Sequence, residues 1–122
     1  VVHSIFGLPG ETKEDMLRTI DYIAHSGAQG IKFHLLHLMK NTKMAEQYYN
    51  GEFELLSEED YIDLICQGIS MIPEEMVVHR LTGDAPRATL IGPMWSLKKW
   101  EVLNAIDKAL VDRDIWQGKN FK

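Results

Sequence analysis

The 122-residue chain contains one cysteine, Cys66. A single cysteine excludes an internal disulfide framework and any metal site built from several cysteines of this chain, and it fits a reducing cytoplasm. No uninterrupted apolar run approaches the roughly 18 residues that a membrane span needs, and no signal-peptide pattern opens the chain. The sequence therefore predicts a cytoplasmic protein without a membrane partner.

Basic residues are also in short supply. Lys and Arg number 13 against 18 Asp and Glu, which gives a formal net charge of −5 at pH 7. This balance argues against a strong, non-specific nucleic-acid-binding surface, although it leaves room for a local basic patch. The last quarter of the chain is more basic than the middle, through Lys98, Lys99, Lys108, Arg113, Lys119 and Lys122.

Strand patterns alternate with helical patterns along the chain. Three strand-then-helix units lie near 1–27, 30–72 and 75–112, and a tail without clear periodicity covers 113–122. This order favours a parallel sheet with right-handed crossovers and with its active loops at the carboxyl ends of the strands. The loops with unusual sequences, GLPGE, HLMKNT and TGDAPR, all follow predicted strands. The sequence thus predicts an α/β fold with a functional rim at that end of the sheet.

Two helix starts carry capping signals. Thr12 precedes Asp15 by three residues, and Ser57 precedes Asp60 by the same spacing, which is typical of a helix N-terminus. In the third unit, a helix from about 96 to 112 places its apolar residues three or four apart, so the stripe is predicted to be buried. That stripe contains Leu97, Trp100, Leu103, Ile106 and Leu110.

The strand at 31–37 has two different faces. Its odd positions are apolar, whereas its even face carries Lys32 and His34. A sheet buried on both sides would not readily accept a lysine, but a barrel with a polar, ligand-filled interior would. Three units are too few to close such a barrel. His37 is expected to face away from His34, so no metal site is predicted.

Four stretches occur in order over nearly the whole chain: GLPGET, HLLHLMKNTKMAE, HRLTGDAPR and WSLKKWEVLNAID. Together they closely resemble the C-terminal half of a radical S-adenosylmethionine (radical SAM) family, the Elp3-like bacterial proteins. The resemblance implies a partial TIM-like barrel, of which this chain would hold the last three β/α units. It also implies S-adenosylmethionine and a [4Fe–4S] cluster as cofactors.

The CxxxCxxC motif that carries the cluster in this family is absent, and Cys66, predicted to lie mid-helix, cannot replace it. The chain is therefore expected to be a fragment, inactive alone, whose missing N-terminal half binds the cluster. The full-length protein would reductively cleave S-adenosylmethionine. Relatives in the wider group act on the wobble uridine of tRNA, so the resemblance implies tRNA as substrate. Sheet edges left open by the missing half are expected to self-associate.

The resemblance assigns Gly7, Leu8, Pro9 and Gly10 to shaping the S-adenosylmethionine site, with His34 as a contact in the barrel lumen. Glycines permit tight or left-handed backbone, proline stiffens the turn, and amides at the following helix N-terminus could receive an anion. The alternatives are an ordinary turn that only closes a corner, and a partly exposed histidine with satisfied hydrogen bonds.

Lys32, Arg80, Asp84 and Arg87 are the candidate substrate-binding residues. Arginine offers a bidentate fork for a carboxylate or phosphate, which an aspartate could orient; the alternative is an ion pair that pins a long loop. Two other functions stay open. One is a TIM-like enzyme fragment whose GLPGE loop holds a phosphate, and the other is a module that docks tRNA or a protein through the C-terminal helix and tail.

Overall fold

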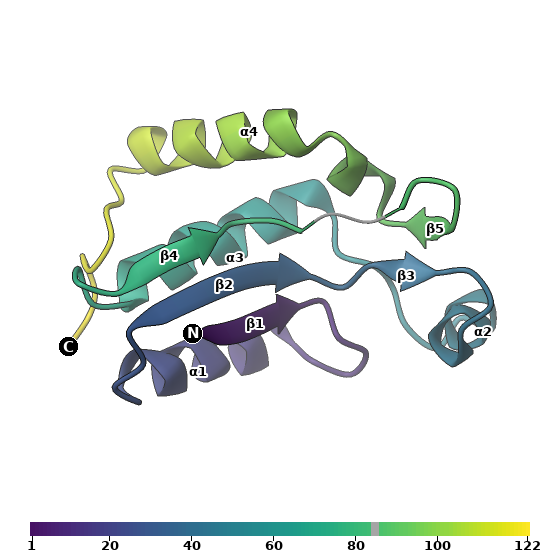
Figure 1. Cartoon of the computed structure of the whole chain (residues 1–122), viewed down its shortest axis with the longest axis horizontal. Helices are drawn as coiled ribbons and strands as arrows, with labels where there is room; N and C mark the ends of the chain where they lie inside the picture. The colour runs from purple at the N-terminus through teal and green to yellow at the C-terminus, as the bar shows by residue number, and fades with distance from the viewer. Residues whose placement is uncertain (84–85) are drawn as a thin grey trace.

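The computed structural model describes residues 1–83 and 86–122. Its centre is a parallel sheet of three strands, β1 (Val2–Phe6), β2 (Gly30–Leu35) and β4 (Val77–Arg80), in the spatial order β1-β2-β4 (Figure 1). The helices are α1 (Lys13–Ala24), α2 (Lys43–Tyr49), α3 (Glu58–Met71) and α4 (Lys99–Asp112). The predicted α/β fold with parallel strands is confirmed.

Both predicted capping signals form. The Thr12 hydroxyl accepts a hydrogen bond from the Asp15 backbone N–H, and the Asp15 carboxylate accepts one from the Thr12 N–H, which completes a capping box at the start of α1. Ser57 caps α3 by accepting from the N–H of Asp60 at 3.1 Å. These bonds satisfy N–H groups that a helix start leaves without intrahelical partners, and they fix where both helices begin.

The core lies between the sheet and the helices α1 and α3. The odd residues of β2 are buried there, as are Ser4 and Phe6 of β1. Tyr61, Leu64 and Ile65 of α3 are buried, whereas Ile62 is only partly buried. A second small sheet was not predicted: Leu38–Met39 (β3) pairs antiparallel with Leu90–Gly92 (β5), and the strand expected at 31–37 already ends at Leu35.

The prediction for the last helix was wrong at Trp100. A 3-10 turn at Met94–Leu97 comes first, and α4 begins only at Lys99, so the helix is rotated relative to the predicted stripe. Val102 and Ile106 are buried where α4 packs against α3, while Trp100 is 74% exposed. Trp95 instead packs partly buried against the core, and its indole N–H donates to the Leu56 carbonyl at 3.0 Å.

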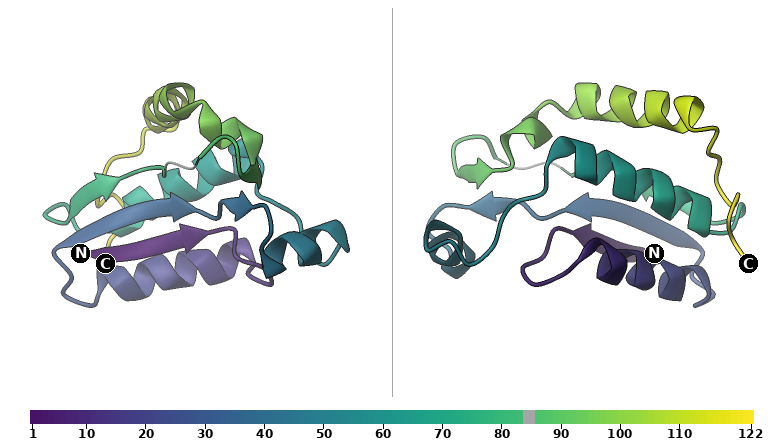
Figure 2. Two further views of the ribbon diagram at one scale, coloured as in Figure 1. Left: turned by 45° about the vertical axis from the view of Figure 1, so that its right-hand side comes forward. Right: turned by 180° about the vertical axis from the view of Figure 1, so that it is seen from behind.

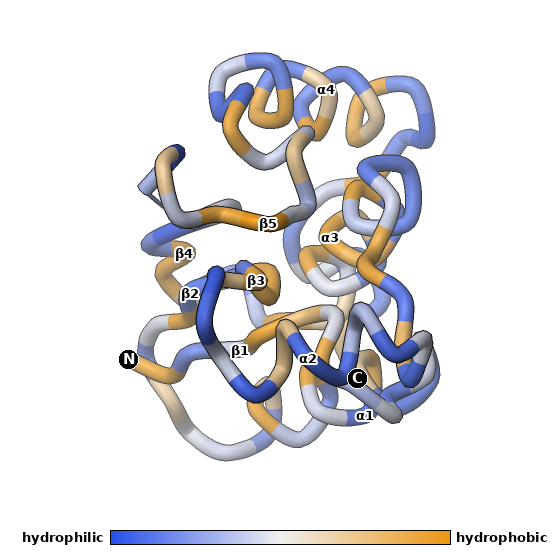
Figure 3. The backbone as a smooth tube through the Cα atoms, turned by 90° about the vertical axis from the view of Figure 1, so that its right-hand side faces the viewer, coloured by the Kyte–Doolittle hydropathy of each residue, from blue (hydrophilic) through white to orange (hydrophobic). Residues whose placement is uncertain are grey.

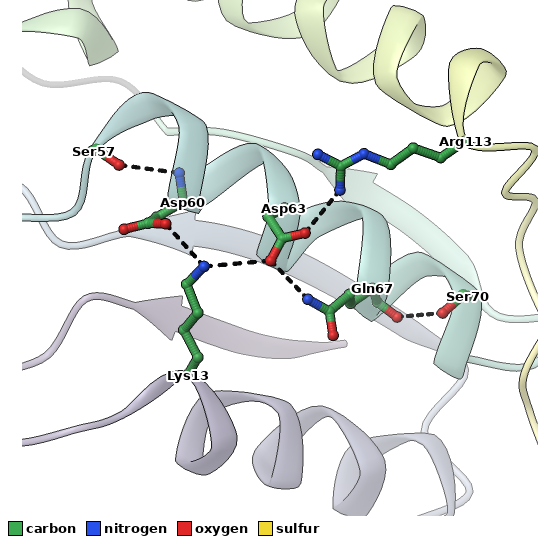
Figure 4. A network of polar contacts seen from close by, with 7 residues as sticks. All are labelled: Lys13, Ser57, Asp60, Asp63, Gln67, Ser70 and Arg113. Carbon is green, nitrogen blue, oxygen red and sulfur yellow. Dashed lines mark hydrogen bonds and ion pairs between the residues drawn. The ribbon is translucent and has the colours of Figure 1, made fainter.

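Asp63 on α3 connects three parts of the chain (Figure 4). Its carboxylate accepts hydrogen bonds from Arg113, in the segment after α4, at 2.8 Å and from Gln67 at 2.7 Å. It also forms an ion pair with Lys13 of α1 at 3.4 Å. Burial by itself would raise the pKa of Asp63, but the hydrogen bonds from Arg113, Lys13 and Gln67 outweigh it and hold the pKa below its usual value. The carboxylate therefore stays ionised and ties α1, α3 and the tail together.

The tail crosses the end of the molecule at which the strands begin (Figure 2). The Gln117 amide donates to the carbonyls of Pro73 at 2.8 Å and Met76 at 2.6 Å, and the Asn120 N–H donates to the Ser70 carbonyl at 2.7 Å. These bonds satisfy carbonyls around the end of α3 and the start of β4. The opposite end of the sheet, where the strands finish, is left for the candidate site.

Candidate functional site

One face of the parallel sheet is open. Viewed along the strands, α1 and α3 lie on one side of β1, β2 and β4, and among the described residues no helix lies over the other side (Figure 3). The parallel register places Lys32 between His3 of β1 and Arg80 of β4, and His34 beside Ile5. The prediction that the even face of β2 is its polar face is therefore confirmed, and the neighbouring strands extend that face.

His34 occupies the middle of this open face. Its ring stacks on that of His3 with 5.2 Å between centroids and 2° between planes. Its Nε2 atom is buried and has no hydrogen-bond partner within the described part of the chain. Burial, followed by the positive charges of His3, Arg80, Lys32 and His37, lowers the pKa of His34. The imidazole is therefore neutral at pH 7 in the protein as described.

His37 does not face away from His34, which corrects the prediction. β2 ends at Leu35, so the alternation of a strand no longer applies two residues later. Gly83 approaches both rings: a Cβ atom on this glycine would lie 3.1 Å from His34 Nδ1 and 3.1 Å from His37 Cε1. A side chain at position 83 would press on both histidines. Even so, no group of three or more His, Cys, Asp or Glu side chains in the described residues is arranged to hold a metal ion.

The GLPG turn forms a separate part of the site. Gly7 and Gly10 have φ of 95° and 82°, so both glycines adopt the left-handed backbone that the sequence suggested. Residues 7–10 line a cavity of about 250 Å³ together with the segment 53–56, and the acidic residues Glu11, Glu54 and Asp60 are among its lining residues. Asp60 is paired with Lys13 at 2.8 Å, but the lining is acidic overall. This disfavours a phosphate in the turn, whereas a cationic or neutral ligand suits it.

Arg80 ends β4 between the open face and a second cavity. That cavity measures about 470 Å³ and lies between β4 and α4, with Lys99 and Leu103 on its helical wall. Thr82 also lines it; this residue is buried, and its hydroxyl has no hydrogen-bond partner among the described residues. Arg87 lies apart from this group in the sequence, in an exposed turn in which the Thr89 N–H donates to the Pro86 carbonyl. Asp84 falls outside the described residues.

The structure thus brings Lys32, His34 and Arg80 together and leaves the GLPG turn as a separate cavity. Sequence reasoning missed His3, which stacks on His34, and His79, whose ring would lie 2.6 Å from a Cβ atom on Gly30 and so covers the same face. Alternation along β1 could have indicated that His3 faces the lumen. The register between strands, which sets the pairing of His3 with Lys32, was not accessible from the sequence.

Comparison with known proteins gives a family. A profile described as the Radical_SAM C-terminal domain matches residues 28–112. The uncharacterised protein YtqA of Bacillus subtilis is 52% identical over 120 residues, and protein YhcC of Escherichia coli is 33% identical over 113 residues. These alignments cover 98% and 93% of this chain, but only 37% of either relative. The chain therefore spans little more than a third of the length of the curated relatives it matches.

A solved structure shares the fold. Elp3 of the archaeon Methanocaldococcus infernus, in a form with an N-terminal deletion, superposes with a TM-score of 0.78 at 18% identity. The superposition covers 94% of this chain and 27% of that Elp3 chain. At this identity the similarity concerns the fold alone, which matches part of a barrel-like structure. None of the helices in the described part of the chain combines the length and hydropathy needed to cross a bilayer.

Proposed function

The chain belongs to the radical SAM C-terminal domain family, and from that premise we propose that it is part of a longer enzyme that cleaves S-adenosylmethionine to modify the wobble uridine of tRNA. The observation that carries the proposal is the open, polar face of the sheet, with Lys32, His34 and Arg80 side by side. Ligand sites of parallel α/β folds form at the carboxyl ends of the strands. His34 and Arg80 lie towards those ends of β2 and β4, whereas Lys32 lies nearer the start of β2.

The residues of this chain do not fit the [4Fe–4S] cluster. Such clusters are held by cysteine thiolates, and Cys66 is fully buried within α3, where burial raises the pKa of its thiol. The cluster ligands must therefore come from the remainder of the full-length protein. This chain is proposed to take part in binding and positioning, and none of its residues is given a role on the iron.

The GLPG turn suits part of S-adenosylmethionine. The sulfonium and ammonium groups of this cofactor are cationic, and the acidic lining contributed by Glu11 and Glu54 is compatible with positive charge. The left-handed Gly7 and Gly10 allow the backbone to approach a ligand without interference from a Cβ atom. When bound, the cofactor supplies the radical chemistry, while this chain shapes its pocket and keeps water from it.

The substrate-binding site is proposed to lie on the open face of the sheet and along β4. Arg80 and Lys32 offer charged donors, and Arg80 also lines the cavity between β4 and α4. Both groups suit the phosphates and polar base edges of RNA. The chain as a whole is acidic, so this binding would be local to the site, as opposed to a general attraction for nucleic acid.

The proposal is tested by reconstituting the full-length protein with iron and sulfide in the absence of oxygen. S-adenosylmethionine and a reductant are added, and 5′-deoxyadenosine is quantified with and without bulk tRNA. Product that depends on the cluster supports a radical SAM enzyme, and an increase with tRNA supports the substrate class. Iron-loaded protein that gives no product under either condition overturns the proposal.

A second candidate is favoured by the exposed indole of Trp100. It lies at the start of α4 beside Lys98 and Lys99, and it is 74% exposed. An exposed aromatic ring flanked by cations is typical of surfaces on which nucleotide bases stack. This helix could therefore dock RNA without taking part in chemistry. Loss of tRNA binding in Trp100→Ala, with cofactor cleavage in the absence of tRNA unchanged, would support that role.

A further inference from the structure

Charge is segregated between the two sides of the sheet. The sequences of the strands, VHSIF, GIKFHL and VVHR, contain no acidic residue. Their open face instead carries His3, Lys32, His34 and Arg80, whereas ion pairs with Asp60 and Asp63 lie on the helical side. Among the described residues, these strands contribute cationic and imidazole side chains to the open face of a chain whose net charge is −5. Such a face favours an anionic ligand.

His34 supplies the second observation. A buried imidazole nitrogen without a partner is costly, because the hydrogen bond it made to water in the unfolded chain is not replaced. The His34 Nε2 atom is in this situation, and the ring stacks on that of His3. A ring packed on its neighbour with an unsatisfied nitrogen is suited to gain a hydrogen-bond partner from a ligand.

We propose that His34, together with His3 and Lys32, binds one anionic group of the substrate, a carboxylate or a phosphate, and that His34 takes up a proton when the anion binds. This inference rests on the proposed function, since it concerns the substrate of that enzyme. The anion accepts a hydrogen bond from protonated Nε2, and its charge offsets the positive groups around the ring. The buried Nε2 atom then gains a hydrogen-bond partner, and Lys32 gains an opposite charge nearby.

The electrostatics give the direction of the effect. Without the anion, burial and the charges of His3, Arg80, Lys32 and His37 lower the pKa of His34. An anion within hydrogen-bond distance favours the charged imidazole and raises that pKa. By linkage, the anion binds more tightly as the pH falls from the pKa of the liganded state to the pKa of the free state, and binding takes up a proton in that range.

The anion is assigned to the substrate because His34 is separate from the turn that is proposed to hold the cofactor. The cavity beside the GLPG turn is lined by Glu11 and Glu54, and His34 is not among its lining residues. His34 instead shares the open face with Lys32 and Arg80. The two sites adjoin along β1, since Leu8 and Glu11 also line a cavity with His3, whereas His34 and Lys32 line neither of these cavities.

The test follows histidine resonances of the full-length protein, labelled at the imidazole carbons, as the pH is varied with and without inorganic phosphate or acetate. Either anion should increase the proton affinity of His34 by about tenfold, equivalent to one pH unit. His25, on the C-terminal end of α1 and stacked on Phe121, serves as the matched control and should not respond. A larger effect of acetate assigns a carboxylate, and a larger effect of phosphate assigns a phosphate.

Three results would overturn the inference: a His34 titration unaffected by both anions, an equal response of His25, or loss of the effect when S-adenosylmethionine is present, which would give the site to the cofactor. His34→Gln retains a hydrogen-bonding amide but cannot take up a proton, so phosphate binding should lose its pH dependence in this variant. None of these measurements requires cofactor cleavage. The inference and the proposed enzyme activity can therefore fail separately.

Discussion

Tyr61 holds the segment that follows β4, and its hydroxyl offers a test of how that segment is positioned. The side chain is fully buried in α3, and its O–H donates to the Leu81 carbonyl at 2.7 Å. Burial raises the pKa of Tyr61, so the group is a neutral donor throughout the physiological range. The bond ties α3 to the segment that continues to Thr82, which lines the cavity between β4 and α4, and to Gly83, which lies near His34 and His37.

Tyr61→Phe removes the hydroxyl while its ring can keep the contacts with Phe6 and Trp95. The loss leaves the Leu81 carbonyl without this donor, which costs about 1–2 kcal/mol for a partly buried acceptor. A change of about 1.4 kcal/mol corresponds to a tenfold change in a local opening equilibrium. Amides in 78–83 of the full-length variant should therefore exchange hydrogen about tenfold faster.

Hydrogen exchange measured by mass spectrometry reports this segment directly. Tyr49→Phe is the matched control, because Tyr49 is 72% exposed. Loss of its hydroxyl should leave the hydrogen exchange of residues 78–83 unchanged. Unchanged exchange over 78–83 in Tyr61→Phe would refute the idea that the bond positions the segment. An equal acceleration in α1 would refute it as well, because the effect would then be a general loss of stability.

Asp63→Asn should destabilise the full-length protein by about 1 kcal/mol at neutral pH, because it weakens two partly exposed ion pairs. The free energy of unfolding in urea measures this loss, and Asp107→Asn, at an exposed position, is the control. Since the pKa of Asp63 is lowered by folding, its contribution is present above about pH 4 and is lost as the pH falls through the lowered value, so wild type and variant should converge in acid. Thr12→Ala should cost about 1 kcal/mol through loss of the capping box, seen as faster exchange at the start of α1; unchanged exchange there would count against it. Residues 1–122 alone should self-associate through the edges of β1 and β4, and a monomer in sedimentation runs at high concentration would contradict this expectation. The same fragment should form no 5′-deoxyadenosine, and detection of this product would contradict that second expectation.

Local signals in the sequence were reliable where one physical effect dominates. Thr12 and Ser57 marked helix starts because a cap depends only on residues within one turn. The polar even face of β2 followed from strand alternation, and the apolar odd face is buried as expected. The order of motifs along the chain indicated the family, which the match over 28–112 supports.

The sequence-based predictions were wrong where tertiary structure determines which way a side chain faces. Trp100 fits a helical stripe, but the 3-10 turn before α4 shifts the phase, and Val102 takes the buried position. His37 fits a strand pattern, but the strand ends at Leu35 and the chain turns into β3. The stack of His3 on His34 depends on the register between two strands that are far apart in sequence. Patterns within one segment carry no information on that register.

The central claim is that the open face of the sheet is where ligands bind, and chemical modification of histidines tests it most directly. The reconstituted full-length protein is treated with diethyl pyrocarbonate alone and with S-adenosylmethionine and tRNA, and the modified histidines are identified by mass spectrometry. The exposed His3 and His79 on the open face should be protected by the ligands, while His25, at the C-terminal end of α1 on the helical side of the sheet, should react equally in both samples. Equal modification of His3 and His79 with and without ligands would contradict the account.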